Sequence, residues 1–510
     1  MPVSLTYPGV YIEEIPHGVR TIVGSSTSVT AFVGRSRLGP VNKPVLIHSF
    51  GDFDRNFGGL WEKSPMSFAV YQYYKNGGKD AVIVRVVNET DPNKAATALY
   101  SLTCSDHGNL LLEASSPGSW GSKLTIKVDK DTKDEKKFFN LTVSYKTTEG
   151  EEQKEILRNL SIDPVSPTFI TKYLEQNSRF LRVRDPVPTE MPENGEVTTP
   201  NVKGMDGGEI GDSVLVPESS AGKKGIYALE DADIFNLLCI PPLTFETDVS
   251  PDTYANAANY CGEHRAMLII DPPGNIGTLD GIKEFFASLS TVSSKKNAAF
   301  FFPRIKMANP MKNNLKESFA PCGAVAGVFA RTDGQRGVWK APAGLEAVLS
   351  GVTELNYTLT DNENGDLNRL GINCLRAFPV VGSVIWGSRT LDGADSLASE
   401  WKYIPVRRLA LYIEESLFRG TKWVVFEPND EPLWAQIRLN IGSFMHNLFR
   451  QGAFQGKTPK EAYFVKCDSE TTTQSDINSG IVNIVVGFAP LKPAEFVVIK
   501  IKQIAGEIQT

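Results

Sequence analysis

The sequence predicts an α/β protein: a core with a mostly parallel or mixed sheet flanked by helices, an inserted β-rich outer domain, and extended N- and C-terminal arms. Two observations carry this prediction. Between residues 226 and 302, short strands that are apolar throughout alternate with helical segments, which is typical of parallel strands covered on both faces. Between residues 92 and 225, apolar density falls and segments alternate apolar with polar residues, as half-exposed antiparallel strands do.

The chain has 510 residues, more than one ordinary core can hold. We therefore divide it into five segments. They are an N-terminal extended arm (1–22), the first part of the α/β core (23–91), the inserted β-rich surface domain (92–225), the main α/β core (226–490) and a C-terminal strand arm (491–510).

Within the main core, strand and helix patterns alternate clearly. Helices are predicted at 251–264 and 279–289, and buried strands at 266–270 and 298–302. A helix made largely of small residues is predicted at 321–330, where it can pack closely against a neighbour. This order of elements favours a mostly parallel sheet.

The clearest signals for the starts and ends of helices lie at 403–454, a segment that is predicted to form a helix, a short strand and a second helix. Pro405 fits a first helical turn, where its missing N–H costs nothing. Gly420 follows the last periodic residue and is predicted to take the left-handed cap conformation. The apolar run 423–426 is predicted to be a buried strand, and Gly452 is predicted to end the second helix.

Both ends of the chain contain candidate strands. Residues 10–15 have strand-forming side chains between turn residues, and this segment pairs either with a later strand of its own chain or with another subunit. Residues 480–490 are predicted to be a buried strand. In 495–502, Val497, Ile499 and Ile501 lie on one face, and such a strand is an aggregation hazard unless it is paired.

Composition excludes several classes of protein. The 53 basic and 59 acidic residues give a net charge of −6, which does not favour nucleic-acid binding. No apolar run reaches the roughly 18 residues that a membrane-spanning helix needs, and the N-terminus does not resemble a secretory signal. The six cysteines are scattered and never paired as CxxC, so we expect buried free thiols in a protein made in the cytoplasm.

An enzyme is the alternative interpretation. Asp271 and Arg304 follow predicted strands, where an α/β enzyme places its site, and His264 could join them. The three residues can also be explained without a catalytic role, as an acid in a loop, an arginine on the surface and a histidine at the end of a helix. Arg35 follows a strand without a G-x-G-x-x-G motif, which favours a solvated loop. Residues 452–458 end in Gly-Lys-Thr, but three residues separate the glycines where a P-loop has four. We assign no catalytic, cofactor-binding or metal-binding residue.

Several segments resemble one known family. They are Tyr-Pro-Gly-Val-Tyr-Ile-Glu-Glu at 7–14, 50–59, the glycine-rich segment 331–344 with its three cations, 384–391, and 407–434 with Arg-Arg-Leu and Phe-Glu-Pro-Asn. These motifs resemble the contractile tail sheath proteins, which build the outer cylinder of contractile phage tails and phage-like injection systems. The matching segments cover most of the chain outside 92–225.

The resemblance implies a structural subunit and no enzyme. It implies a helical sheath of six-fold rings around an inner tube, which contracts to drive the tube through a target envelope. The implied partners are further copies, the inner tube protein, baseplate and terminal cap proteins, and sister sheath proteins, in a particle made in the bacterial cytoplasm. It also implies arms that complete the sheets of neighbouring subunits. The candidate contact residues are Val10, Tyr11, Ile12, Phe496, Val497, Val498, Ile499 and Ile501.

Overall fold

The computed structural model describes residues 21–499, apart from 91, 93, 106–107, 148–149 and 151. The described chain forms two compact units, one from residues 27–407 and one from residues 21–26 with 408–499. The boundary between the units falls inside helix α9 (Ile404–Gly420).

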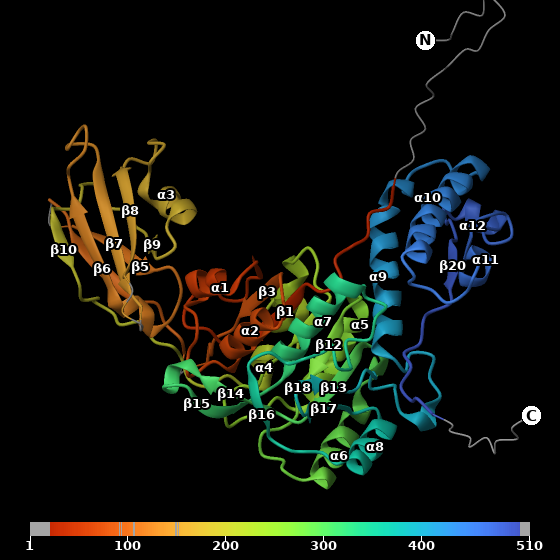
Figure 1. Cartoon of the computed structure of the whole chain (residues 1–510). Coiled ribbons are helices and arrows are strands. Elements are labelled where there is room, and N and C mark those ends of the chain that lie inside the picture. The colour runs from red at the N-terminus through yellow and green to blue at the C-terminus, as the bar shows by residue number, and fades with distance from the viewer. Residues whose placement is uncertain are drawn as a thin grey trace, which may run out of the picture. The chain divides into compact units, whose positions relative to one another are not determined.

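An eight-stranded sheet forms the centre of the larger unit, in the order β18-β17-β13-β12-β11-β1-β3-β2 (Figure 1). The strands from β17 to β3 run parallel, and β18 and β2 add antiparallel edges. The strands are β1 (Thr30–Gly34), β2 (Val45–Ile47), β3 (Ala81–Arg85), β11 (Leu237–Cys239), β12 (Met267–Ile270), β13 (Ala298–Phe302), β17 (Asn373–Phe378) and β18 (Gly382–Ile385). The predicted α/β class is confirmed.

Both faces of this sheet are buried. In β12, Leu268 and Ile270 point into one hydrophobic core, and Met267 and Ile269 point into the other. Helices α5 (Pro251–Glu263) and α6 (Leu279–Ser288) contribute to the first core, and α2 (Pro65–Lys75) and α7 (Cys322–Arg336) to the second. A strand buried on both faces needs apolar side chains throughout, which is why these strands could be recognised from the sequence.

Helices α2 and α7 approach each other closely. A Cβ atom on Gly323 would lie 2.0 Å from the carbonyl oxygen of Ala69, and one on Gly327 would lie 2.5 Å from that of Tyr73. Glycine is therefore needed at these two positions for contact between the helix backbones. The small-residue helix is confirmed, but it continues to Arg336, so the first part of the segment 331–344 is helical and not a loop.

Residues 99–197 contain two antiparallel sheets that share one core. One sheet has the order β10-β6-β7-β8 and the other β4-β5-β9. The strands are β4 (Leu99–Thr103), β5 (Asn109–Ala114), β6 (Leu124–Asp129), β7 (Phe139–Lys146), β8 (Glu152–Leu160), β9 (Leu181–Val183) and β10 (Gly195–Val197), with helix α3 (Ile170–Asn177) beside them. Trp120 and Phe180 lie in their common core. This part of the chain is β-rich, as its alternating pattern predicts.

The buried side chain of Arg85, at the end of β3, connects the central sheet to the β-rich region. Its side chain is 1% exposed. Its guanidinium donates to the carbonyl oxygens of Ser36 (3.1 Å), Gly39 (2.7 Å) and Pro117 (2.7 Å). One buried cation therefore connects the end of the central sheet to the loop after β1 and to the segment that leads into β6.

The rest of the larger unit consists of short elements. A three-stranded sheet contains β14 (Ile305–Asn309), β15 (Leu315–Phe319) and β16 (Val352–Leu355), and the remaining α-helices are α1 (Phe50–Phe57), α4 (Asp212–Leu215) and α8 (Asp361–Leu370). Thr360 and Glu363 form a capping box at the start of α8.

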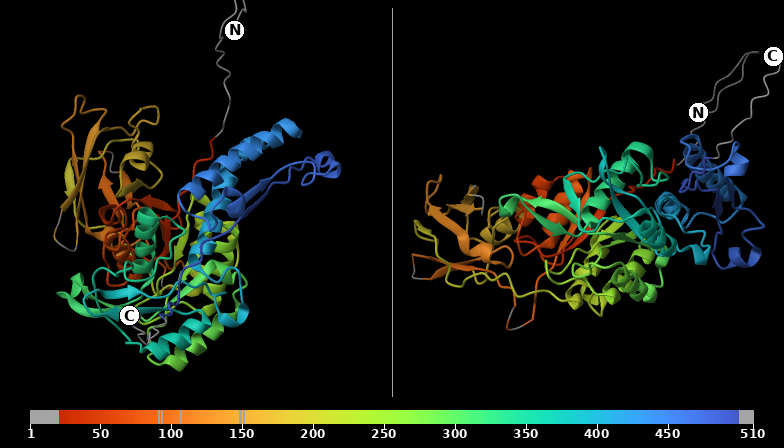
Figure 2. Two further views of the ribbon diagram at one scale, coloured as in Figure 1. Left: turned by 45° about the vertical axis from the view of Figure 1, so that its right-hand side comes forward. Right: turned by 60° about the horizontal axis from the view of Figure 1, so that its bottom comes forward.

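The smaller unit is built around two long helices, the C-terminal part of α9 and α10 (Glu431–Arg450), with the short helices α11 (Pro459–Ala462) and α12 (Gln474–Asn478) (Figure 2). Gly452 has a φ of 80°, so the predicted end of α10 is confirmed. Gly420 has no such conformation. Its role is close packing, because a Cβ atom there would lie 2.7 Å from Cγ2 of Ile22.

Candidate functional site

The smaller unit contains a two-stranded sheet of β19 (Tyr463–Lys466) and β20 (Val485–Phe488). The strands are antiparallel, with Tyr463 opposite Phe488 and Lys466 opposite Val485. Within the described residues, each strand has the other as its only strand neighbour. Each therefore has an outer edge on which a further strand can pair. A two-stranded sheet is itself only marginally stable in water, so added strands would strengthen it.

This small sheet is anchored to the helices beside it. The backbone N–H of Ala489 donates to the carbonyl oxygen of Ala462 at 2.8 Å, and that of Gln455 donates to the carbonyl oxygen of Ala489 at 2.9 Å. In addition, the guanidinium of Arg438 on α10 donates to the carbonyl oxygen of Cys467, directly after β19. The two strands are thus held in position before any further strand arrives.

Some apolar side chains at this sheet are left uncovered by the described part of the chain. Phe464, Val485 and nearby Ile481 are exposed. The predicted buried strand at 480–490 is therefore wrong in its extent and in its burial. Sequence reasoning also missed β19, whose strand-forming run Tyr-Phe-Val begins immediately after the short helix α11.

Four of the predicted arm residues lie near the end of the described chain. Phe496, Val497, Val498 and Ile499 are 73%, 81%, 79% and 80% exposed and belong to no strand of this single chain. The other four, Val10, Tyr11, Ile12 and Ile501, lie outside the described residues. Consecutive exposed apolar residues are characteristic of contact surfaces. Their contacts with other subunits stay a prediction.

The predicted buried strand at 423–426 is wrong. Lys422–Val424 form a 3-10 turn, and the side chains of Val425 and Phe426 are 64% and 102% exposed. A short apolar run by itself does not reveal whether its side chains face the subunit's own core. Here the run turns the chain from α9 into α10, and no described strand lies beside it.

The residues of the enzyme alternative have structural partners. Oδ1 of Asp271 accepts a hydrogen bond from the N–H of Cys322 at 2.8 Å. Burial raises the pKa of Asp271 to about 7, although Cys322 and Arg304 act against the rise. Arg304 is buried and not on the surface as expected; it pairs with Asp248. Nε2 of His264 instead lies 3.2 Å from Glu230. Each of the three side chains is thus used in holding the fold.

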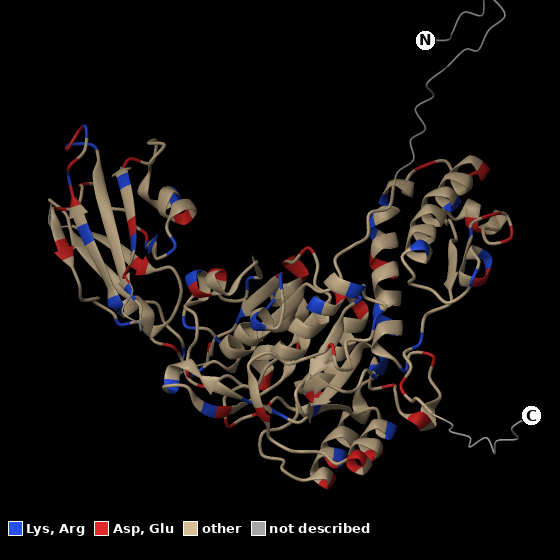
Figure 3. Ribbon diagram, in the orientation of Figure 1, with Lys and Arg blue, Asp and Glu red and all other residues tan. Residues whose placement is uncertain are grey.

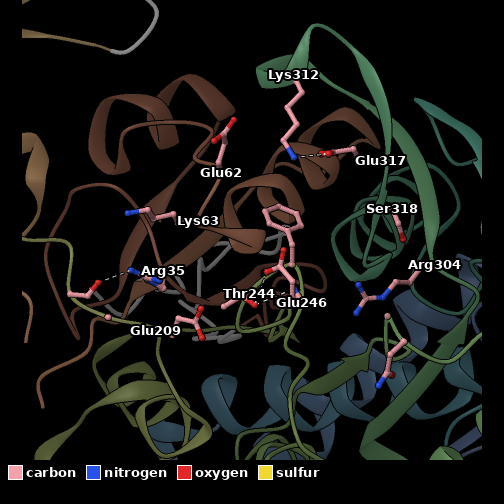
Figure 4. A pocket seen from close by; sticks show the side chains of 15 residues that line it. Arg35, Glu62, Lys63, Glu209, Thr244, Glu246, Arg304, Lys312, Glu317 and Ser318 are labelled. Carbon is pink, nitrogen blue, oxygen red and sulfur yellow. Dashed lines mark hydrogen bonds and ion pairs between the residues drawn. The ribbon is translucent and has the colours of Figure 1, made fainter. Parts of the chain in front are cut away.

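A polar pocket of about 810 Å³ lies beyond the carboxyl ends of β1, β11, β12 and β13 (Figure 4). Its cations are already paired: Nζ of Lys312 lies 2.6 Å from Glu317, and Nζ of Lys63 lies 3.4 Å from Asp206. Arg35 is buried, so the expected solvated loop is wrong; its Nη2 donates to the carbonyl oxygen of Gly207 at 3.4 Å. Further carboxylates line the pocket, namely Glu62, Glu209 and Glu246. This balance of charge does not favour the phosphates of a nucleotide.

The segment 452–458 has a capping role. Thr458 forms a capping box with Glu461 at the start of α11, and the backbone N–H of Lys457 donates to Oε2 of Glu461 at 2.8 Å. The N–H groups that would cradle a phosphate in a P-loop are therefore directed at a carboxylate of the protein.

Three features were looked for in the described residues: a stripe of like charge, a cluster of metal-ligating side chains and a membrane-spanning helix. In the view of Figure 3, basic and acidic residues are interspersed and neither forms a continuous stripe. No group of three or more His, Cys, Asp or Glu side chains in the described part is placed to hold a metal ion. None of its helices is both long and apolar enough to cross a bilayer.

Comparisons with known proteins agree on one family. The family profile described as the phage tail sheath C-terminal domain matches residues 397–504. The tail sheath protein of Vibrio phage KVP40 is 28% identical over 190 residues, which cover 36% of this chain and 27% of the relative. The chain thus matches about a quarter of that relative's length.

Two solved structures share the fold over nearly the whole chain. One is the sheath complex of an extracellular contractile injection system, PVC, in the contracted state, with a TM-score of 0.60, 22% identity and coverage of 99% of both chains. The other is the contracted helical sheath of the anti-feeding prophage, with a TM-score of 0.59, 23% identity and coverage of 98% and 100%.

The fold is therefore that of contractile sheath subunits. The profile over residues 397–504 and the relative in a phage make the chain similar to the contractile tail sheath proteins in sequence as well as in fold. The resemblance seen in the sequence motifs is confirmed.

Proposed function

We propose that the chain is the structural subunit of a contractile sheath. It polymerises helically around an inner tube and contracts to drive the tube through a target envelope. Its partners are further copies in six-fold rings, the inner tube protein, baseplate and cap proteins, and sister sheath proteins, in a phage tail or phage-like particle assembled in the bacterial cytoplasm. The observation that carries this proposal is the small sheet with two open edges in a chain that also exposes Phe496–Ile499.

The polymer forms by strand addition. Residues 496–501 of one copy pair with an outer edge of β19 or β20 in a second copy, and residues 10–12 of a third copy pair with the other edge. Main-chain hydrogen bonds supply the affinity, and Val497 and Ile499 cover the exposed apolar side chains of the sheet. Because donor and acceptor are different surfaces, this head-to-tail contact does not close on itself and propagates as a helix.

Contraction then requires links that survive large movements. Arms paired through their backbones remain attached while the folded bodies rotate as rigid units, and the extended linkers absorb the change in dihedral angles. The extended sheath is trapped behind a kinetic barrier until the baseplate releases it.

The experiment removes the donor strand. A chain lacking Ala494–Thr510 should stay folded and soluble but form no tubes in negative-stain electron microscopy. The double variant Val497→Lys, Ile499→Lys should behave alike, because two charges cannot be buried on the acceptor sheet. Val165→Lys is the matched control, since Val165 is also exposed, at 88%, but lies outside the arms. Normal tubes from the truncated chain would refute strand addition.

An α/β nucleotide-binding enzyme or hydrolase is the alternative function. It predicts ATP binding that Lys457→Ala abolishes, measurable by isothermal titration calorimetry. The capping role of Lys457 and Glu461 predicts no ATP binding by either protein.

A further inference from the structure

The polar pocket of Figure 4 lies at a switch point of the central sheet. Strand β1 has β11 on one side and β3 on the other. Helix α2, which precedes β3, contributes to one core, and α5, which connects β11 to β12, contributes to the other. In open α/β sheets, ligands bind beyond the carboxyl ends of the strands at such a point. The position of the pocket therefore favours a ligand, and its lining determines the chemistry of that ligand.

The charges of the lining do not balance. Four cations and four glutamates line the pocket. Lys63, Arg304 and Lys312 each form an ion pair, the first two with aspartates outside the lining. Three glutamates form no ion pair with a described residue, namely Glu62, Glu209 and Glu246. The pocket therefore presents an excess of negative charge, which favours a cationic ligand.

These three glutamates come from separate parts of the chain (Figure 4). Glu62 lies between α1 and α2, Glu209 precedes α4, and Glu246 lies in the segment after β11. All three are exposed, so their carboxylates can reach a ligand in the pocket. Exposed carboxylates by themselves hold a cation only weakly. A further feature is needed to fix the position of a ligand.

A small recess beside the pocket contains a buried amide oxygen without a partner. Thr244, Phe245, Arg304 and Ser318 line both the pocket and the recess. Gln72 of α2 also lines the recess and is 1% exposed, and its Oε1 accepts no hydrogen bond from a described residue. A buried acceptor without a donor is costly to the folded state. A ligand that brings an N–H group to this oxygen would remove that cost.

The size of the recess limits the group that can reach Gln72. The recess measures about 10 Å³, against about 810 Å³ for the pocket, which is room for about one water-sized group. A primary ammonium group is about that size and carries three N–H donors, whereas a trimethylammonium group is larger and carries none. Arg304 does not exclude a cation, because it pairs with Asp248 and its Nε donates to the carbonyl oxygen of Pro272 at 2.9 Å.

We propose that this pocket binds a linear aliphatic amine with two or more primary ammonium groups, a class that includes the polyamines. One ammonium group enters the recess and donates to Oε1 of Gln72. The remaining positive charge lies among the three unpaired glutamates. All of these residues belong to the unit of residues 27–407, so binding does not depend on the arms or on polymerisation.

The first experiment compares two ligands of equal charge and chain length. Isothermal titration calorimetry of the full-length chain uses hexamethylenediamine and hexamethonium, at low ionic strength so that charges are little screened. The diamine should bind. Hexamethonium, whose ends are trimethylammonium groups, should bind at least tenfold more weakly because neither end fits the recess. Equal affinities would mean a general attraction between opposite charges and would overturn the proposal, as would failure of the diamine to bind.

The second experiment removes the charge of the pocket. The first variant neutralises its unpaired glutamates, through Glu62→Gln, Glu209→Gln and Glu246→Gln. It should bind the diamine at least tenfold more weakly than the unmodified chain. The matched control removes the same charge from exposed glutamates of the β-rich region, through Glu190→Gln, Glu193→Gln and Glu196→Gln. The control should keep the affinity of the unmodified chain, and an equal loss in both variants would contradict a site at the pocket.

The third experiment separates a ligand-binding role of Gln72 from a structural one. Gln72→Met removes the unpartnered oxygen and keeps the shape of the side chain. Affinity for the diamine should fall about tenfold, while the melting temperature without ligand should stay the same or rise. Unchanged affinity, or a lower melting temperature without ligand, would refute the assigned role of this oxygen. Electron microscopy of the pocket variant adds one more check: loss of sheath polymers would assign the pocket to a lysine side chain of a neighbouring copy and so overturn the small-molecule site.

Discussion

The carboxyl group of Asp271 accepts a hydrogen bond from the backbone N–H of Cys322, the first residue of α7, at 2.8 Å. Asp271 follows β12 directly, so this bond joins the end of a central strand to the start of a helix. A negative charge is favourable at a helix N-terminus, but burial acts more strongly and raises the pKa of Asp271 to about 7. The group is poised to change its charge near neutral pH.

Asp271 should make stability depend on pH. Its pKa in the folded protein, about 7, is above its ordinary value of 3.8. The folded state therefore binds more protons than the unfolded state between these two values, and stability from this group falls as pH rises through that window. Above a pH of about 8 the contribution is lost. Asp271→Asn, which keeps an oxygen for the Cys322 N–H, should remove this component.

The measurement is the melting temperature of both proteins at intervals between about pH 4.5 and 8. The difference between the two curves isolates Asp271 from the other carboxyl groups. As pH rises, the melting temperature of the variant should increase relative to that of the unmodified protein. Parallel curves would contradict a raised pKa at this position.

Two of the three glycines of α7, Gly327 and Gly334, should respond oppositely to the same substitution. Gly327→Ala places a Cβ atom 2.5 Å from the carbonyl oxygen of Tyr73 and should destabilise the fold by about 1–3 kcal/mol. Gly334→Ala has room, with its nearest contact at 3.8 Å from Nζ of Lys79, and should stabilise by about 0.5–1 kcal/mol through helix propensity. Urea denaturation measures both. Equal effects would argue against close contact between α2 and α7.

Arg85 should tolerate neither a neutral nor a shorter cationic replacement. Burial lowers the pKa of its guanidinium to about 9, yet its N–H groups reach four carbonyl oxygens. Arg85→Met leaves these oxygens without donors, and Arg85→Lys cannot reproduce the planar fork. We expect each to lower the free energy of unfolding by about 3 kcal/mol or more, measured by denaturant titration. Unchanged unfolding of Arg85→Lys would show that charge alone suffices.

The six cysteines should be unreactive in the folded protein. All six are buried free thiols, as the sequence predicts. Burial raises the pKa of Cys374 to about 12 and that of Cys467 to about 11, which further suppresses the reactive thiolate. Ellman's reagent at pH 8 should therefore react slowly with native protein and rapidly with all six thiols in denaturant. Rapid reaction of one thiol in native protein would identify a locally open segment.

The central sheet could be predicted from the sequence because its apolar residues are buried within their own subunit. Met267–Ile270 are apolar on every side since both faces of β12 are buried, and Ser250 caps α5 where Pro251 begins it. Local pattern and tertiary environment agree there. Helix α8 was missed, because Asn362–Asp366 looks like a turn by composition and its capping box begins earlier, at Thr360.

The candidate site could be predicted only in part. Sequence patterns predicted an apolar strand that includes Phe496–Ile499, which stays a prediction, but could not show that β19 and β20 form a separate small sheet. Val425 and Phe426 were assigned to a core because hydrophobicity does not distinguish a side chain that is buried by its own chain from one left exposed. Arg35 and Arg304 were expected in solvent, since burial of a cation depends on carbonyl and carboxylate partners distant in sequence.

The eight-stranded sheet differs from the two-stranded sheet in how much of its edge strands is left open for pairing. Beside β18, residues 344–349 supply backbone hydrogen bonds, with the N–H of Leu349 donating to Ser383 and that of Ile385 donating to Ala347. At the opposite margin, β2 is only three residues long. A strand from another molecule therefore has little exposed edge with which to pair on the eight-stranded sheet. Pairing of a strand from another molecule is therefore less favourable at the central sheet than at the small one.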